Sequence, residues 1–147
     1  MSHTDPKYIG PGYWASFHRR SFFADMTKDN PTYEKIVERR ETVAKSIVQD
    51  VENFPCFNCR EHAISYMKQY PITDSIFKRD KNALFNWTVD FHNFVNNRIG
   101  KPIVTIEQAT LLWSDDGKGT CFKNCGQNED YVSGEDTIKR YLLLLNG

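Results

Sequence analysis

The sequence predicts an all-α protein, a four-helix bundle with a short fifth helix and a C-terminal extension that contains a further helix. Apolar residues recur at helical spacing over four long segments. No segment shows the sustained period-two alternation of a β-strand, and no hairpin motif is present. A chain of 147 residues, 39% of them hydrophobic, can bury the core of one domain.

The first two helices each follow a segment that contains proline. An apolar stripe from Trp14 to Phe22 predicts the first helix, and we expect a turn at Gly10-Pro11-Gly12 before it. The second helix is expected to start at Asn30-Pro31, a capping residue followed by proline at the first helical position. Its stripe from Ile36 to Val51 predicts a long amphipathic helix.

Three further helices have clear start or stop signals. The third begins at Cys56 and stops at Pro71, because proline cannot continue a helix. The fourth runs from Leu84 and ends at Gly100, which suits the C-terminal cap of a helix. The fifth runs from Thr105 to Trp113, and Gln108 completes a capping box at its start.

The composition of the sequence changes after Trp113. A polar, glycine-rich linker leads to Cys121 and Cys125, and Ser133 to Leu145 then predicts a terminal helix with one apolar face. We therefore expect the folded domain to span residues 8–114 and the extension to span residues 115–147.

Composition and charge exclude several classes of protein. Lys and Arg number 19 and Asp and Glu number 19, and this zero net charge argues against a nucleic-acid-binding protein. The polar N-terminus does not look like a signal peptide, and no apolar run reaches transmembrane length. We expect a cytoplasmic protein with no membrane partner, in which cysteines are more often catalytic or metal-binding than structural.

The most informative motif is Cys56-Phe57-Asn58-Cys59, at the start of the third helix with His62 one turn later. The positive end of a helix lowers the pKa of a thiol and favours thiol exchange. Such a pair occurs in thioredoxin-like centres, in zinc half-sites and in flavin-linked disulfides. The absence of predicted strands argues against the first. Zinc needs two more ligands, which His62 or the pair of Cys121 and Cys125 would supply, so zinc and flavin both remain open.

Histidines and aromatic rings gather on the expected inward faces of the helices. Aromatic residues make up 14% of the chain and are compatible with an ordinary core. The histidines are His18, His62 and His92, the rings include Trp14, Tyr66 and Trp87, and the polar groups at the end of the fourth helix are Asn93, Asn96 and Lys101. Rings for stacking, amides for a ribityl chain and a cation for phosphates suit a flavin dinucleotide. The glycine-rich dinucleotide fingerprint is absent, so the residues allow a flavin without requiring one.

Between about Gly10 and Trp113 the chain contains, in order, the motifs Trp14-x-x-x-His18, Pro55-Cys56-x-x-Cys59-x-x-His62, Trp87, His92-Asn93-x-Val95-Asn96, Gly100-Lys101-Pro102 and Trp113. In this order the motifs resemble those of the Erv/ALR flavin-linked sulfhydryl oxidases. Each piece alone is weak, but the ordered set is specific. The compact length is similar to that of the small single-domain members found in large DNA viruses, which would place the protein in the host cytoplasm and in the virion.

The resemblance implies an FAD-dependent thiol oxidase that forms disulfides in protein substrates and passes electrons to O2, giving H2O2. Cys59 would face the flavin, Cys56 would face the incoming thiol, and no metal would be needed. A homodimer is implied, as is a protein thiol partner, with thioredoxin-like proteins among the candidates. The implied FAD contacts are Trp14, His18, Cys59, His62, His92, Asn93, Val95, Asn96, Lys101 and Trp113, to which the helical period adds Tyr66.

Two alternatives stay open. Cys121 and Cys125 lie outside the motif-bearing region, as do the pairs that relay electrons in some family members, so they are candidates for a shuttle disulfide; a pair that pins the tail is the alternative. For the chain as a whole, the alternative function is a zinc-stabilised helical interaction module that uses all four cysteines.

Overall fold

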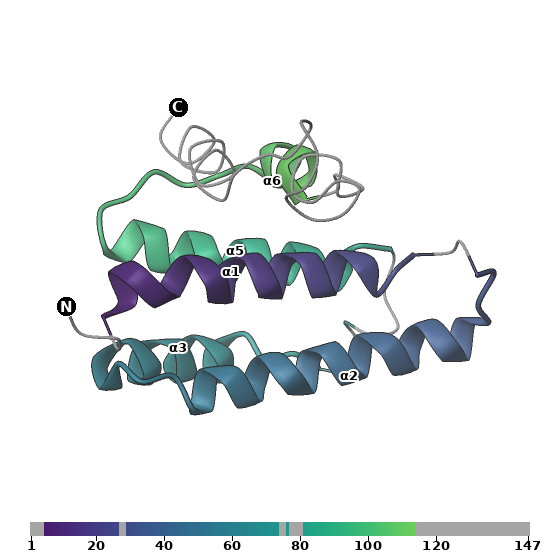
Figure 1. Cartoon of the computed structure of the whole chain (residues 1–147), viewed down its shortest axis with the longest axis horizontal. Helices are drawn as coiled ribbons and strands as arrows, with labels where there is room; N and C mark the ends of the chain where they lie inside the picture. The colour runs from purple at the N-terminus through teal and green to yellow at the C-terminus, as the bar shows by residue number, and fades with distance from the viewer. Residues whose placement is uncertain (1–4, 27–28, 74–75, 77–80, 114–147) are drawn as a thin grey trace, which may run out of the picture. The chain divides into compact units, whose positions relative to one another are not determined.

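The structure, a computed structural model, describes residues 5–26, 29–73, 76 and 81–113 (Figure 1). These residues form five α-helices and no β-strand, which confirms the all-α prediction. The helices are α1 (Pro6–Phe23), α2 (Tyr33–Glu52), α3 (Phe57–Gln69), α5 (Ala83–Arg98) and α6 (Ile106–Trp113). None of the helices in the described part is long and apolar enough to span a membrane. The chain divides within α5, after His92, into two compact units.

Helix α1 begins earlier than its apolar stripe suggests. The Asp5 side chain caps the helix by accepting a hydrogen bond from the backbone N–H of Lys7 at 2.9 Å, and Pro6 occupies the first helical position. The helix continues through Gly10-Pro11-Gly12, so the turn expected there is wrong. Pro11 removes only one intrahelical hydrogen bond. The pair Asp5-Pro6, a capping residue followed by proline, was the sequence signal for this earlier start, and the prediction followed the apolar stripe instead.

Helix α2 starts two residues after the predicted Asn30-Pro31 cap. Asn30 has a left-handed backbone with φ 51°, whereas a capping residue needs an extended one. Thr32 has that extended conformation, and its side chain accepts a hydrogen bond from the backbone N–H of Lys35 at 3.2 Å. The predicted stripe is confirmed, because its members Ala44, Ile47 and Val51 are buried.

Aromatic rings form a large part of the core in the described part of residues 1–92. α1 lies alongside the first part of α5 (Figure 1), where Phe22 meets the fully buried Phe85 edge to face at 5.3 Å. Tyr66 of α3 stacks on Phe91 at 5.1 Å, and the buried Trp87 donates its Nε1–H to the Tyr70 carbonyl at 2.9 Å. Each such ring stabilises the fold by about 1.5–3 kcal/mol relative to an exposed ring. Many of the aromatic residues are therefore simply core.

The described part of residues 93–147 is the end of α5, a loop and α6. Gly100 has φ 78° and ends α5, as predicted. The backbone N–H groups of Gly100 and Lys101 donate to the carbonyls of Asn97 and Asn96, which is a glycine C-cap of the Schellman type. The predicted capping box is also present, because Thr105 and Gln108 exchange hydrogen bonds at 2.9 and 3.1 Å.

Candidate active site

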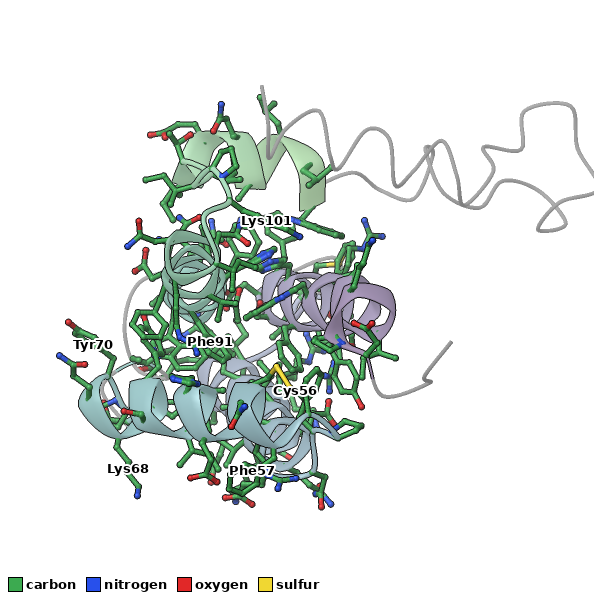
Figure 2. All side chains as sticks on the ribbon, turned by 90° about the vertical axis from the view of Figure 1, so that its left-hand side faces the viewer. Cys56, Phe57, Lys68, Tyr70, Phe91 and Lys101 are labelled. Atoms are coloured by element: carbon green, nitrogen blue, oxygen red, sulfur yellow. A yellow bond between two sulfur atoms is a disulfide. The ribbon has the colours of Figure 1, made fainter. Side chains whose placement is uncertain are left out.

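A disulfide joins Cys56 and Cys59 at the N-terminus of α3, with 5.3 Å between the two Cα atoms. Cys56 is the capping residue, and its Sγ accepts a hydrogen bond from the backbone N–H of Cys59 at 3.3 Å. In Figure 2 the sulfur–sulfur bond points from α3 toward the side of Phe91, whereas Phe57 points away from it. The predicted position of the cysteine pair at a helix N-terminus is therefore confirmed.

Two side chains that follow Cys56 on α3, those of Phe57 and His62, are at least partly exposed to solvent. Phe57 is 63% exposed, and the guanidinium of Arg60 lies 5.4 Å from the centre of its ring. His62 is half-buried, and its Nδ1 donates to the Asn58 carbonyl at 2.6 Å, because a carbonyl oxygen can only accept. This bond holds the His62 ring against its own helix, and its predicted convergence with the other two histidines stays a prediction.

The other two histidines do meet. His18 Nε2 lies 2.9 Å from His92 Nδ1, and His18 Nδ1 lies 3.0 Å from the hydroxyl oxygen of Thr88. All three side chains are buried. Burial lowers the pKa of His18 from 6.5 to about 3, so its ring is neutral at physiological pH. No role was predicted for Thr88, although a polar residue on the apolar stripe of α5 was a signal for one.

Trp14 covers the histidine pair from α1. Its ring is stacked on His92 at 4.2 Å with an interplanar angle of 7°, and it meets Phe91 edge to face at 4.9 Å. Trp14 is itself half-buried. Tyr66, in contrast, is buried among core rings, and burial is the main reason that its pKa rises to about 12. Tyr66 therefore packs as a core residue, and its contact with FAD stays a prediction.

The predicted polar residues at the end of α5 hold the following loop. Asn93 Nδ2 donates to the Val104 carbonyl at 2.7 Å, and Asn93 Oδ1 accepts from the Val104 backbone N–H at 2.9 Å. Asn96 Nδ2 makes a longer contact of 3.5 Å with the Pro102 carbonyl. Lys101 is exposed, and Val95 and Trp113 are half-buried. Sequence reasoning missed this structural role of the amides, and their contact with FAD stays a prediction.

Metal binding can be assessed only in the part of the chain that the structure describes. There, no three His, Cys, Asp or Glu side chains are grouped so that they could hold a metal ion. Cys121 and Cys125 lie outside the described residues, as does the predicted terminal helix. The described residues therefore contain at most half of the four-cysteine zinc site that was the alternative.

Comparison of the sequence with known proteins identifies the family of this chain. The model of the Erv1/Alr family matches residues 11–114. The chain belongs to the Erv1/Alr family. The FAD-linked sulfhydryl oxidase of a warthog isolate of African swine fever virus is 35% identical over 97 residues, which cover 65% of this chain and 71% of the viral protein.

Two other relatives align with a larger share of this chain. A protein of Invertebrate iridescent virus 6, whose name includes the words FAD-linked sulfhydryl oxidase, is 32% identical over 116 residues, 77% of this chain and 98% of the relative. The FAD-linked sulfhydryl oxidase ERV1 of Oryza sativa subsp. japonica is 29% identical over 114 residues, 77% of this chain and 51% of the plant protein.

Proposed function

We propose that this chain is an FAD-dependent thiol oxidase that forms disulfide bonds in protein substrates and passes the electrons to O2, giving H2O2. The observation that carries the proposal is the Cys56–Cys59 disulfide at the N-terminus of α3, in a chain of the Erv1/Alr family. The names of its viral and plant relatives support FAD as the cofactor and thiols as the substrate.

The chain's own cysteines perform the thiol exchange. A substrate thiolate attacks Cys56 Sγ, so that a bond forms between these two sulfurs and the Cys56–Cys59 bond breaks. Cys59 leaves as a thiolate at the third position of α3, where the positive end of the helix stabilises the negative charge. A second substrate thiolate then attacks the substrate sulfur of the mixed disulfide and releases Cys56. The substrate has lost two electrons, which the reduced cysteine pair now holds.

The chemistry of the remaining side chains fits FAD. Trp14 and His92 offer stacked rings, Asn96 and the lysine ammonium of Lys101 offer hydrogen-bond donors, and the latter also offers a charge for phosphates. The residues proposed to hold FAD are Trp14, His18, Cys59, His62, Tyr66, His92, Asn93, Val95, Asn96, Lys101 and Trp113. When bound, FAD would accept the two electrons of the dithiol and transfer them to O2.

Partners and location are part of the same proposal. The substrate is a protein dithiol, O2 is the acceptor, and two chains form a homodimer. The viral relatives support a viral origin, and for a viral protein we propose the host cytoplasm and the virion as the place of action. The cytoplasmic location rests on the sequence alone.

The test uses the full-length protein. We expect a yellow protein whose flavin is released on denaturation, and which consumes O2 and produces H2O2 in equal amounts when a dithiol is added. The zinc-stabilised interaction module instead predicts a colourless protein with stoichiometric zinc and no O2 consumption. A chain that binds no FAD after refolding with excess cofactor would overturn the oxidase proposal.

A further inference from the structure

We propose that Thr88 is a positioning residue which, through His18, fixes the tautomer of His92 so that the ring proton of neutral His92 lies on Nδ1. Its Nε2 then carries the lone pair and acts as a hydrogen-bond acceptor. This inference deepens the proposed function, since His92 is one of the residues proposed to contact FAD, but the tautomer itself can be tested without the cofactor.

The hydroxyl group of Thr88 is completely buried. Its Oγ1 lies 2.6 Å from the Phe85 carbonyl oxygen. A carbonyl oxygen can only accept, so the single hydroxyl proton of Thr88 must lie in this contact. The neighbouring hydroxyl of Ser21 lies 3.4 Å from Thr88 but donates to the Phe17 carbonyl at 2.7 Å. Thr88 Oγ1 therefore faces His18 as an acceptor.

The proton positions on the two histidines follow in order. His18 Nδ1, 3.0 Å from Thr88 Oγ1, must be the donor in that contact. His18 is neutral because burial lowers its pKa to about 3, and a neutral imidazole has only one N–H. His18 Nε2 therefore carries a lone pair. His92 Nδ1, 2.9 Å away, must donate to it.

The same contacts fix the orientation of the His92 ring. Trp14 covers one face at 4.2 Å with nearly parallel planes, and the hydrogen bond to His18 fixes the rotation within that plane. Neutral His92 thus offers an acceptor at Nε2, which suits a hydroxyl or amino group of FAD. A phosphate oxygen would need a donor there. In its neutral form His92 would therefore suit a sugar hydroxyl or a base amino group of FAD better than a phosphate oxygen.

Replacing Thr88 with valine removes the oxygen that accepts the hydrogen bond from His18 Nδ1. In Thr88→Val, an Nδ1–H on His18 would lose its acceptor in the core, which is unfavourable. The pair can avoid this cost if His18 moves its proton to Nε2 and donates to His92, whose own proton then moves to its Nε2. Thr88→Ser keeps the hydroxyl and should keep the original order.

Long-range 1H–15N correlation spectra of 15N-histidine-labelled, cofactor-free protein at pH 8 test the assignment. We expect His92 Nδ1 to show the shift of a protonated nitrogen and Nε2 that of an unprotonated one, in the natural chain and in Thr88→Ser. Thr88→Val should reverse or mix the two signals. Thr42→Val is the matched control, because Thr42 also bonds a carbonyl of its own helix, at 2.9 Å, but lies on α2 and belongs to no part of the site.

Two results would overturn the proposal: an Nε2–H tautomer of His92 in the natural chain, or an unchanged Nδ1–H in folded Thr88→Val. The spectrum of the natural chain decides the first even if the valine variant does not fold. FAD titration gives a second readout, in which Thr88→Val should weaken binding by about fivefold to tenfold and Thr88→Ser should restore it. If the natural chain shows the expected tautomer but binds no FAD, the proposed function fails while the tautomer assignment stands.

Discussion

The carboxylate of Asp25 lies 2.5 Å from Nε of Arg40, and both side chains are buried. The other carboxylate oxygen of Asp25 accepts the backbone N–H of Asn82 at 2.7 Å. Asp25, two residues beyond the end of α1, thus binds both α2 and the segment that leads into α5. This ion pair was not predicted, because a charged residue within an apolar stripe does not identify its partner.

We predict that Asp25→Asn destabilises the fold strongly. The variant leaves the Arg40 guanidinium buried without its carboxylate, and breaking a buried pair from one side costs about 3–5 kcal/mol. Urea denaturation measures the change in the free energy of unfolding. Asp29→Asn is the control, because it breaks the ion pair of an exposed carboxylate with Arg39 and should change stability little. Equal effects of the two variants would contradict the prediction.

Acid should destabilise the protein through His18. Its pKa is about 3 in the folded state and 6.5 in the unfolded state, so the unfolded chain binds the additional proton between these values. The stabilisation is complete above pH 6.5 and is lost toward pH 3, at about 1.4 kcal/mol per pH unit. Asp90 acts in the opposite direction, because burial raises the pKa of its carboxyl.

The measurement is the free energy of unfolding between about pH 3 and pH 6.5, the window set by the two pKa values of His18. His18→Asn should lower stability at neutral pH and flatten the dependence on pH in this window. A slope that is the same in the natural chain and in a folded His18→Asn variant would show that another group causes the acid sensitivity.

Local signals in the sequence predicted much of the fold. The capping box of Thr105 and Gln108, the terminal Gly100 and the start of α3 at Cys56 each depend on residues that are adjacent in the chain, and all three are confirmed. The prediction at Pro11 was wrong because proline often marks a helix end but can also be accommodated within a helix, as it is in α1. The prediction at Asn30 was wrong because its backbone is left-handed, with φ 51°, and not extended as in a capping residue.

The site was less predictable because its contacts are tertiary. The sequence spacing that placed His18 and His92 inward also placed His62 inward, and only the structure shows that His62 bonds the Asn58 carbonyl. The role of Asn93 in holding Val104 likewise depends on the path of a loop, which no periodic pattern records.

We predict that Cys56 and Cys59 have different roles. Both Cys56→Ser and Cys59→Ser should abolish disulfide formation, because thiol exchange needs the pair. Cys56→Ser leaves the thiolate of Cys59 next to the flavin, and this variant should show a long-wavelength absorbance band between thiolate and oxidised FAD. Visible spectra of the two FAD-loaded variants measure this. A band that appears only in Cys59→Ser would reverse the assignment.

A homodimer built on the faces of the first two helices is predicted mainly from the family resemblance, with support from the apolar residues Phe22, Phe23 and Met26. Phe22 packs on Phe85 within the chain, so the support from these residues comes from Phe23 and Met26, which are half-buried. Light scattering at micromolar concentration should give twice the mass of the 17.2 kDa chain, and Phe23→Ser should weaken the dimer. A monomer mass for the natural chain would contradict the prediction.

We predict that Cys121 and Cys125 form a shuttle disulfide that passes electrons from protein substrates to the Cys56–Cys59 pair. They lie outside the motif-bearing region, and Gly117 and Gly119 precede them in the sequence. Two cysteines four positions apart close only a short loop, so a disulfide between them would add little stability by restricting the unfolded chain. A role in electron transfer is then the better reason for the pair.

The double variant Cys121→Ser/Cys125→Ser separates the shuttle from a structural role. Oxidation of a folded protein dithiol should slow strongly, whereas oxidation of dithiothreitol should remain nearly unchanged, because a small dithiol can reach Cys56 directly. Both rates are measured as O2 consumption on the same FAD-loaded preparation, with the melting temperature as a control for folding. A variant that melts at a lower temperature but oxidises the protein substrate at the natural rate would show that the pair is structural.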